Sequence, residues 1–424
     1  MYRILSRLIL GIFLLLVFSL GKNLGENIEI YKYKIDTPLL KEKYPVSFGS
    51  GIFFVGKEGG DLIFLSITDR GPNVDSPDVL LDNRLYPSKI FLVPEFSPKI
   101  GYLRVSNNRC YVDKYYDVYN ENREKSTGKP LSLNKIGSTG EIPIGENLRV
   151  IDFDDLGIDP EGITLDDKGF IWICEEYGPS IIKIEPQTYR ILERYYPGKG
   201  LPEILKWRQP NRGFEAITFQ DKKIYAVVQS TLDIEGKTKN NANFVRIVEF
   251  TPENKKVNMY AYPLDEDYSK YSDGMIGDMT SLGKGRFLIL ERGKLSSGYK
   301  NIVYLIDLNS AVPIPETLDE SQTKDKKIEN RFYVKKTKII DLRNLGYNFE
   351  KSEGLALIQK NILAILNDND FGVKSNLSTL KSPQLINGRI WERDTLKDVT
   401  ENFKILSNEE ILELWIIKLP FYLE

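Results

Sequence analysis

The sequence predicts an all-β protein, a β-propeller of four-stranded antiparallel blades. Three observations carry this prediction. A strand, turn and strand pattern recurs along the chain, both ends of the chain are strand-like, and the long helices that a parallel α/β sheet needs are missing from the pattern. The 424 residues are enough to bury a large core in one domain.

Four clear copies of the pattern align on an acidic residue that opens the first strand. Each copy continues through alternating apolar positions and a polar turn into a strongly apolar second strand. The copies are residues 160–178, 214–230, 277–293 and 352–370. A spacing of 14 residues separates Glu161 from Glu175, Glu215 from Gln229, Asp278 from Arg292 and Glu353 from Asn367. A looser copy at 50–75 has Ser50 in place of the acid.

Further strands follow most copies, so each unit is expected to be a four-stranded sheet. Such units cannot bury both faces alone and stack radially on their neighbours as blades. The third strands are expected at 89–96, 180–186, 243–252 and 301–308, and fourth strands at 257–264 and 337–342. Five blades are legible, and a sixth is expected within 97–150, where residues 101–119 form a strand pair without the opening acid. The segments 27–36 and 414–420 are expected to close the ring within one blade.

The expected domain is a single propeller over residues 27–424, with loop insertions near 97–150, 315–338 and 393–415. Residues 315–338 are rich in charge and poor in apolar side chains, which predicts a solvated excursion. The segment 393–415 is the one stretch whose pattern favours a helix, which we expect to lie across the last blade.

The N-terminal residues 1–21 have the pattern of a signal peptide. Arg3 and Arg7 precede an apolar run at 8–20, which is short for a membrane span. The alternative is an uncleaved anchor through 8–20; a cleaved signal would leave no stable membrane insertion. In both cases the domain is expected to be exported, either periplasmic or secreted. Cys110 and Cys174 could then form a disulfide, or remain two buried thiols.

Histidine is absent from the sequence, which excludes a Ser-His-Asp or Cys-His triad and any imidazole metal site. With only two cysteines, the plausible metals are hard cations bound by oxygen. The basic residues are spread along the chain and the net charge is -2, so we expect no nucleic-acid partner.

The repeated acids are expected to gather at one mouth of the propeller. The first strand of each blade lines the central channel and the second strand returns to the same end. Like charges gathered in this way repel unless a cation compensates them, and carboxylate and amide oxygens suit Ca²⁺. The expected metal ligands are Glu161, Glu175, Glu176, Glu215, Asp278, Glu353, Asn367 and Asp368. An alternative role for such acids is structural, as acceptors of backbone N–H groups from a neighbouring blade.

Several motifs, taken together, resemble the phytase-like family, the "esterase-like activity of phytase" domain. The resemblance covers about residues 45 to 372 and keeps the order of the motifs. They are TDRGPN (68–73), GKPLSL (128–133), DPEGI (159–163), EEYGP (175–179), NRGFEAIT (211–218), SEGL (352–355) and NDNDFG (367–372). It implies an exported propeller with phosphoesterase or phosphodiesterase activity. Ser50 and Gln229 depart from a uniform ring of acids, which favours one or two asymmetric metal sites.

The resemblance also implies roles for individual residues. The expected catalytic residues are Glu161, Glu215, Arg70, Arg212 and Arg292, with a divalent cation, taken as Ca²⁺, as the cofactor. The expected substrate-binding residues are Asp69, Arg70, Asn73, Arg212 and Arg292, and the expected partner is a small phosphate ester bound by a monomer. Two alternatives remain: a Ca²⁺-dependent lactonase or other ester hydrolase, and a non-catalytic propeller that presents its mouth to a glycan or protein.

Overall fold

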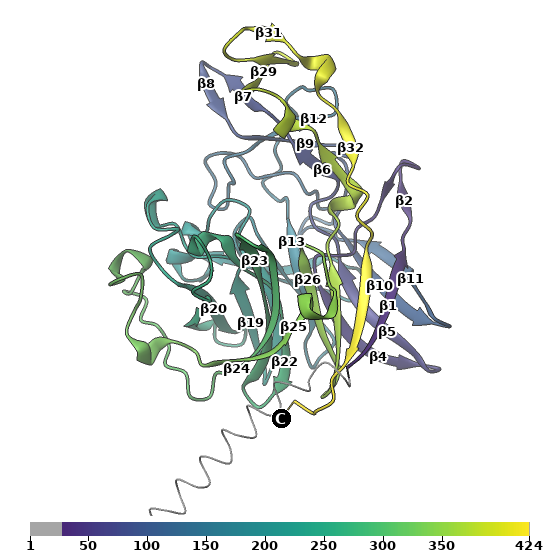
Figure 1. The fold of residues 1–424 in the computed structure, drawn as a ribbon, viewed down its shortest axis with the longest axis vertical. Coiled ribbons are helices and arrows are strands. Elements are labelled where there is room, and N and C mark those ends of the chain that lie inside the picture. The colour runs from purple at the N-terminus through teal and green to yellow at the C-terminus, as the bar shows by residue number, and fades with distance from the viewer. Residues whose placement is uncertain (1–27, 424) are drawn as a thin grey trace, which may run out of the picture.

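The computed structural model describes residues 28–423, which form five four-stranded antiparallel blades in a closed ring (Figure 1). The first strand of each blade contacts the first strands of both neighbours. Blade 1 contains β4 (Ile52–Glu58), β5 (Asp61–Ile67), β10 (Lys99–Ser106) and β11 (Arg109–Asp117), and blade 2 contains β13 (Pro160–Leu165), β14 (Ile171–Glu175), β15 (Ser180–Ile184) and β16 (Ile191–Pro197). Blade 3 contains β18 (Phe214–Gln220), β19 (Lys223–Val228), β20 (Phe244–Thr251) and β21 (Lys256–Pro263). Blade 4 contains β22 (Gly274–Gly283), β23 (Arg286–Leu295), β24 (Gly298–Asp307) and β25 (Lys336–Asp341).

Blade 5 closes the ring with strands from both ends of the chain, as the sequence predicted. Its strands are β26 (Ser352–Gln359), β27 (Ile362–Asn367), β33 (Glu413–Lys418) and β1 (Glu29–Asp36). The strand β1 is antiparallel to β33, with Tyr31 opposite Ile416. It also pairs in parallel with β11 through Ile35 and Cys110, which joins blades 5 and 1 edge to edge.

Within residues 28–423 the segment 97–150 does not form the expected sixth blade. Its strands β10 and β11 are the outer strands of blade 1, because Ile100 pairs with Ile67 of β5. The third strand expected at 89–96 is also wrong. Only β9 (Ser88–Phe91) forms there, and it pairs with β6 (Asn73–Asp75) and β12 (Ile142–Gly145) outside the ring.

The strand β9 belongs to a set of short sheets, here called the mouth lobe, which extends from one end of the ring (Figure 1). The lobe follows directly after the second strands of blades 1 and 5. Its other strands are β7 (Asp78–Leu81), β8 (Arg84–Tyr86), β28 (Val373–Ser375), β29 (Pro383–Ile386), β30 (Arg389–Glu392), β31 (Lys397–Asp398) and β32 (Ile405–Ser407). The parallel pairing of Leu385 in β29 with Val79 in β7 joins segments from opposite halves of the chain.

The helix predicted at 393–415 is wrong. The segment contains β31, a 3₁₀ turn at Thr400–Asn402, β32 and the start of β33. Val399 is buried in the same apolar cluster as Ile390 and Leu385, so the sheet of the mouth lobe decides the conformation of this segment.

The segment 315–338 is also less solvated than the sequence predicted. Glu320 is fully buried against Arg246 of β20, and Leu318 and Tyr333 pack on the cluster that contains Phe244. The segment is therefore anchored to the outside of blade 3.

The remaining elements are small. They are β2 (Leu39–Leu40), β3 (Tyr44–Pro45), β17 (Gly200–Leu201) and 3₁₀ turns at Glu203–Trp207, Ile234–Gly236, Tyr271–Asp273, Glu320–Gln322, Asn330–Phe332, Leu342–Leu345, Asp370–Gly372 and Leu377–Thr379. No helix among residues 28–423 is long and apolar enough to cross a membrane. The expected signal peptide or anchor lies outside the described residues. Cys110 and Cys174 are free and buried.

Candidate functional site

The first hairpin of each blade brings two equivalent residues to the mouth. In blades 2 to 5 the strand register slips at a bulge near the start of the first strand. We call the bulged residue the opening position. The residue before the bulge pairs with a residue of the second strand, and we call the residue that follows this partner the closing position. The opening positions are Glu161, Glu215, Gly277 and Glu353, and the closing positions are Glu176, Gln229, Arg292 and Asp368. Blade 1 has no bulge at this place, because its register slips between Phe54 and Gly56; there Ser50 precedes the first strand and Asp69 follows the second.

Asp278 does not occupy an opening position, contrary to the alignment made from the 14-residue spacing. The bulge in blade 4 lies between Ile276 and Asp278, so Gly277 is the equivalent of Glu161. The Asp278 carboxylate accepts hydrogen bonds from the Leu355 N–H at 2.6 Å and the Met279 N–H at 2.7 Å. It therefore links the first strands of blades 4 and 5.

Two overlapping groups of three acids lie at the mouth. Asp159, Glu161 and Glu176 form one group, and Glu161, Glu215 and Glu353 form the other. Within each group one carboxylate oxygen of every residue lies within 4.8 Å of the others, and all are buried. Glu161 belongs to both groups, is 8% exposed, and receives no hydrogen bond or ion pair from residues 28–423. An unpartnered carboxylate in this position is the feature that most needs a cation.

Arg292 neutralises part of the second group. Its Nη2 lies 3.0 Å from Glu215 and also contacts Glu353, so one guanidinium joins blades 3, 4 and 5. The amide of Gln229 donates to Glu176 at 3.2 Å and to Glu215. Gln229 and Arg292, the closing residues of blades 3 and 4, therefore bind acids of neighbouring blades.

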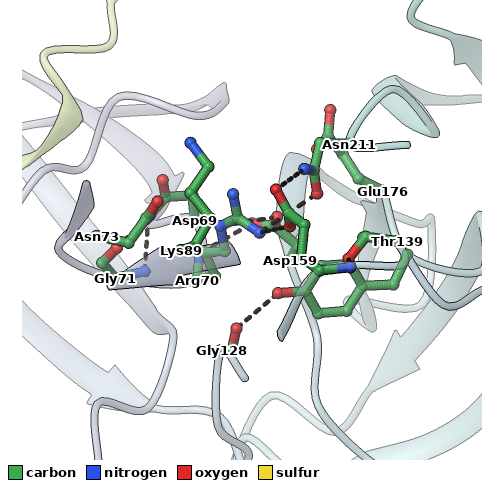
Figure 2. A network of polar contacts seen from close by, with 12 residues as sticks. Asp69, Arg70, Gly71, Asn73, Lys89, Gly128, Thr139, Asp159, Glu176 and Asn211 are labelled. Atoms are coloured by element: carbon green, nitrogen blue, oxygen red, sulfur yellow. Dashed lines mark hydrogen bonds and ion pairs between the residues drawn. The ribbon is translucent and has the colours of Figure 1, made fainter. Parts of the chain in front are cut away.

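Arg70 lies beside Asp159 of the first group (Figure 2). Its backbone N–H donates to Asp159 at 3.0 Å, and its Nη1 lies 3.3 Å from Glu141 and from the Asn211 side-chain oxygen. The backbone at Gly128 passes so close that a Cβ there would lie 1.8 Å from the Arg70 carbonyl oxygen. The GKPLSL motif therefore begins with glycine because the chain contacts Arg70 directly.

The electrostatics of the mouth are those of crowded, buried acids. Burial and the neighbouring carboxylates raise the pKa of Glu161 and of Glu176 well above its usual value. Burial also raises the pKa of Glu353 to about 7, although Arg292 opposes this, and raises the pKa of Asp368 to about 6. In Arg212, burial and the nearby Arg292 lower the guanidinium pKa.

Other predicted site residues lie at the mouth but are held by the protein. The Glu175 carboxylate accepts from the N–H groups of Tyr177, at 2.8 Å, and Gly178, at 2.9 Å. Asn367 bonds the backbone of Ile411 and Glu413, which fixes the last strand against β27. These contacts match the structural role that the sequence left open for such residues.

Asp69 and Asp368 follow the second strands of blades 1 and 5. Asp69 is half-buried, accepts from the Gly71 N–H at 2.8 Å, and has a raised pKa because of burial and then Asp368 and Asp159. Asp368 accepts from Ser47 at 2.8 Å and lies 3.3 Å from Lys351.

Asn73 and Arg212 each make one hydrogen bond to a backbone carbonyl. The Asn73 amide donates to the Gly71 carbonyl at 2.9 Å. Arg212 is half-buried and contacts the Ser272 carbonyl, with no ion pair to any residue in 28–423. Of the three predicted arginines, Arg212 alone has a guanidinium free of a carboxylate in the described chain.

Four residues of the site were not predicted. Asp159 and Asn211 are the first residues of the motifs DPEGI and NRGFEAIT, which were already singled out, so their positions were a usable signal. Glu141 and Lys351 lie outside the repeat and outside these motifs, and no spacing in the sequence points to them.

The donor set fits Ca²⁺. Calcium bonds oxygen at about 2.3–2.6 Å, so ligands on opposite sides of the ion are about 5 Å apart, which matches the limit of 4.8 Å within each group. Carboxylates supply all of these donors. The arrangement can hold a hard divalent cation at the mouth, next to half-buried cationic side chains.

The fold and the site define a five-bladed propeller with a buried cluster of acids at one mouth. The chain belongs to the phytase-like family: residues 58–371 match the family described as esterase-like activity of phytase. The resemblance inferred from the motifs is therefore confirmed, and the family indicates a hydrolase on a propeller fold.

Solved structures resemble the chain only distantly. The catalytic domain of a GH62 α-L-arabinofuranosidase from Coprinopsis cinerea matches with 8% identity and a TM-score of 0.37 over 92% of this chain and 97% of that one. Virginiamycin B lyase from Staphylococcus aureus matches with 10% identity and a TM-score of 0.29 over 93% and 100% of the two chains. YCF48 bound to D1 peptide matches with 12% identity and a TM-score of 0.30 over 80% and 93%. These values carry no argument about function, and no curated protein is significantly similar in sequence.

Proposed function

We propose that the protein is an exported, Ca²⁺-dependent phosphoric ester hydrolase that acts as a monomer on a small phosphate ester. The observation that carries the proposal is the Glu161 carboxylate, which is buried, lacks a donor in the described chain and belongs to both acid groups. Family membership supports a hydrolase, and the acids support the cation.

The acids at the mouth would hold the ion. The candidates are Asp159, Glu161, Glu176, Glu215 and Glu353. A bound Ca²⁺ would stabilise charge on a phosphoryl oxygen and acidify water. The protein's own contribution is to keep these carboxylates close together in a buried site, where a fixed charge acts more strongly than in water.

Arg212 is the proposed contact for the non-bridging oxygens of the substrate. Its guanidinium is half-buried and free of a carboxylate in residues 28–423, so it can donate to an anion without breaking an ion pair. Arg70 and Arg292 are committed to buried acids and are proposed to position those acids.

A carboxylic acid is the proposed proton donor to the leaving oxygen, since the chain has no histidine. Asp368, which is not among the acids proposed to hold the ion, has a pKa that burial raises to about 6 and can carry a carboxyl proton near that pH. It lies at the mouth, at the closing position of blade 5.

The test is a metal-dependence assay on several esters. Protein treated with a chelator would be assayed before and after addition of Ca²⁺ or Mg²⁺, with phosphomonoester, phosphodiester and lactone probes, while the melting temperature is followed. We expect Ca²⁺ to restore phosphate ester hydrolysis and raise the melting temperature. Glu161→Gln should abolish turnover and keep the fold, whereas Glu316→Gln, at an exposed acid, should change neither.

An ester hydrolase without phosphatase activity is the second candidate, favoured by the description esterase-like activity. Lactone opening in the absence of phosphate release would support it. A folded protein with no turnover under any ion would instead support a non-catalytic propeller that binds a glycan or protein. Export is proposed from the N-terminal pattern and is tested by cell fractionation of the full chain.

A further inference from the structure

We propose that Arg292 is a built-in cation that fills one of the two acid groups and limits the mouth to a single Ca²⁺. The ion would then bind in the other group, formed by Asp159, Glu161 and Glu176. This inference rests on the proposed function only in taking Ca²⁺ as the ion of the site.

Blade 4 departs from the other blades at both equivalent positions. Its opening position is Gly277, where three other blades have glutamate, and its closing position is the only cation, Arg292. Both changes act in the same direction, because one removes a negative charge from the mouth and the other adds a positive charge. Of the four blades that have the bulge, blade 4 alone has no acid at either position.

A side chain cannot be added at Gly277 without moving the neighbouring blade. A Cβ at this position would lie 1.9 Å from the Ser352 carbonyl oxygen. The guanidinium of Arg292 from the same blade reaches Glu215 on one side and Glu353 on the other. It is buried, and its Nε has no hydrogen-bond partner among the described residues. Arg292 thus compensates, from the closing position, the acids of both flanking blades.

The two acid groups consequently offer different numbers of free carboxylates. In the group that contains Glu215 and Glu353, both of these residues already pair with Arg292, and only Glu161 is free. In the other group Arg70 contacts only Asp159. Glu176 there accepts one bond from the neutral amide of Gln229. Each group thus has one arginine beside it, but Arg292 pairs two carboxylates of its group and Arg70 pairs one. The group with Asp159 and Glu176 keeps two carboxylates without a cation and is therefore favoured.

The binding of Ca²⁺ alone, measured by calorimetric titration of chelator-treated protein, tests the inference without any substrate. The wild type should bind one ion. Arg292→Met should bind a second ion, because it frees Glu215 and Glu353, while Arg292→Lys keeps the charge and should still bind one. Circular dichroism would verify that each variant is folded.

A second pair of variants decides the question if Arg292→Met does not fold. Glu176→Gln should weaken Ca²⁺ binding by about tenfold or more, since it removes a charged ligand, and Glu353→Gln should change it by less than about threefold. The opposite order of effects, two ions in the wild type, or one ion in a folded Arg292→Met would overturn the inference and leave the proposed function intact. A wild type that binds no Ca²⁺ would overturn both.

Discussion

Arg246 and Glu320 form an ion pair that is closed off from solvent, with Nε and Oε1 2.8 Å apart and neither side chain exposed. Arg246 lies on β20 in blade 3, and Glu320 lies in the charge-rich segment 315–338. A second contact, from Arg246 Nη2 to the Leu318 carbonyl at 3.0 Å, reinforces the attachment. One buried arginine therefore holds the segment against the propeller.

Breaking this pair should destabilise the protein strongly. Glu320→Ala leaves the Arg246 charge buried without a partner, which typically costs about 3–5 kcal/mol of unfolding free energy. Urea unfolding measures the loss. The matched control Glu316→Ala, at an exposed acid of the same segment, should change stability by less than about 0.5 kcal/mol. Equal effects of the two substitutions would show that the segment is not anchored by the pair.

Asp278 should contribute to stability and not to metal binding. Asp278→Ala leaves the N–H groups of Leu355 and Met279 without their acceptor, at a cost of about 1–3 kcal/mol for each buried group. We expect a lower melting temperature and an unchanged dissociation constant for Ca²⁺. Asp278→Asn, which keeps one acceptor oxygen, should lose less stability. A folded Asp278→Asn with much weaker Ca²⁺ binding would instead identify Asp278 as a ligand.

The metal-free protein should become less stable as the pH rises from about 4.5 to about 7. Burial raises the pKa of Glu353 from 4.5 to about 7, so in this range the folded state binds more protons than the unfolded state. Stability then falls with increasing pH, by about 3 kcal/mol for this group. Below pH 4.5, the usual pKa of Glu353, the carboxyl is protonated in both states and this loss of unfolding free energy disappears.

Calorimetric melting in the presence of a chelator, at pH 5, 6, 7 and 8, measures this dependence. Added Ca²⁺ should raise the melting temperature most at pH 8, where the acids of the mouth are ionised. Glu353→Gln should flatten the profile of the metal-free protein. A melting temperature that rises from pH 5 to pH 8 in the chelated wild type would contradict the prediction.

Arg212 should affect substrate binding with little effect on the fold. Because its guanidinium has no carboxylate partner in the described chain, Arg212→Ala leaves no buried acid unpaired. Loss of a charge-assisted hydrogen bond to a phosphate oxygen should raise KM by about tenfold or more. Steady-state kinetics on the phosphate ester hydrolysed best, with the melting temperature as a second measurement, tests this.

Two controls make the Arg212 result interpretable. Arg331→Ala removes an exposed arginine outside the ring and should change neither KM nor the melting temperature. Arg70→Ala leaves Asp159 and Glu141 without a buried cation and should lower the melting temperature markedly. An Arg212→Ala protein with unchanged KM would exclude Arg212 as the phosphate contact.

Much of the propeller could be predicted because residues close together in the sequence mark its strands and hairpins. Alternation of apolar residues marks strands such as β13 and β14, and the repeated hairpin shows that the units are alike. The strand-like ends predicted the closure that β1 and β33 make. The false sixth blade arose where this argument failed. The strands β6 to β9 of the mouth lobe are inserted between β5 and β10, and two strands separated in this way cannot be recognised as neighbours from their own residues.

The candidate site could be predicted only in outline. The recurrence of Glu161, Glu215 and Glu353 indicated acids at one mouth, and the structure places them together. A β-bulge shifts the register by one residue, which is invisible in a count along the chain. Asp278 was therefore taken for an opening acid in place of Gly277.

The sequence by itself determined the class of fold, the strand-like closure and the supply of carboxylates at the mouth, since all of these depend on residue type and short-range periodicity. Only the tertiary structure decided which acids remain free, because Glu215 and Glu353 are paired by Arg292 of blade 4, and Asp159 of blade 2 is paired by Arg70 of the neighbouring blade 1. The reason is that a buried charge is neutralised by whichever opposite charge lies near it in space, and the closed ring brings together residues that are distant along the chain.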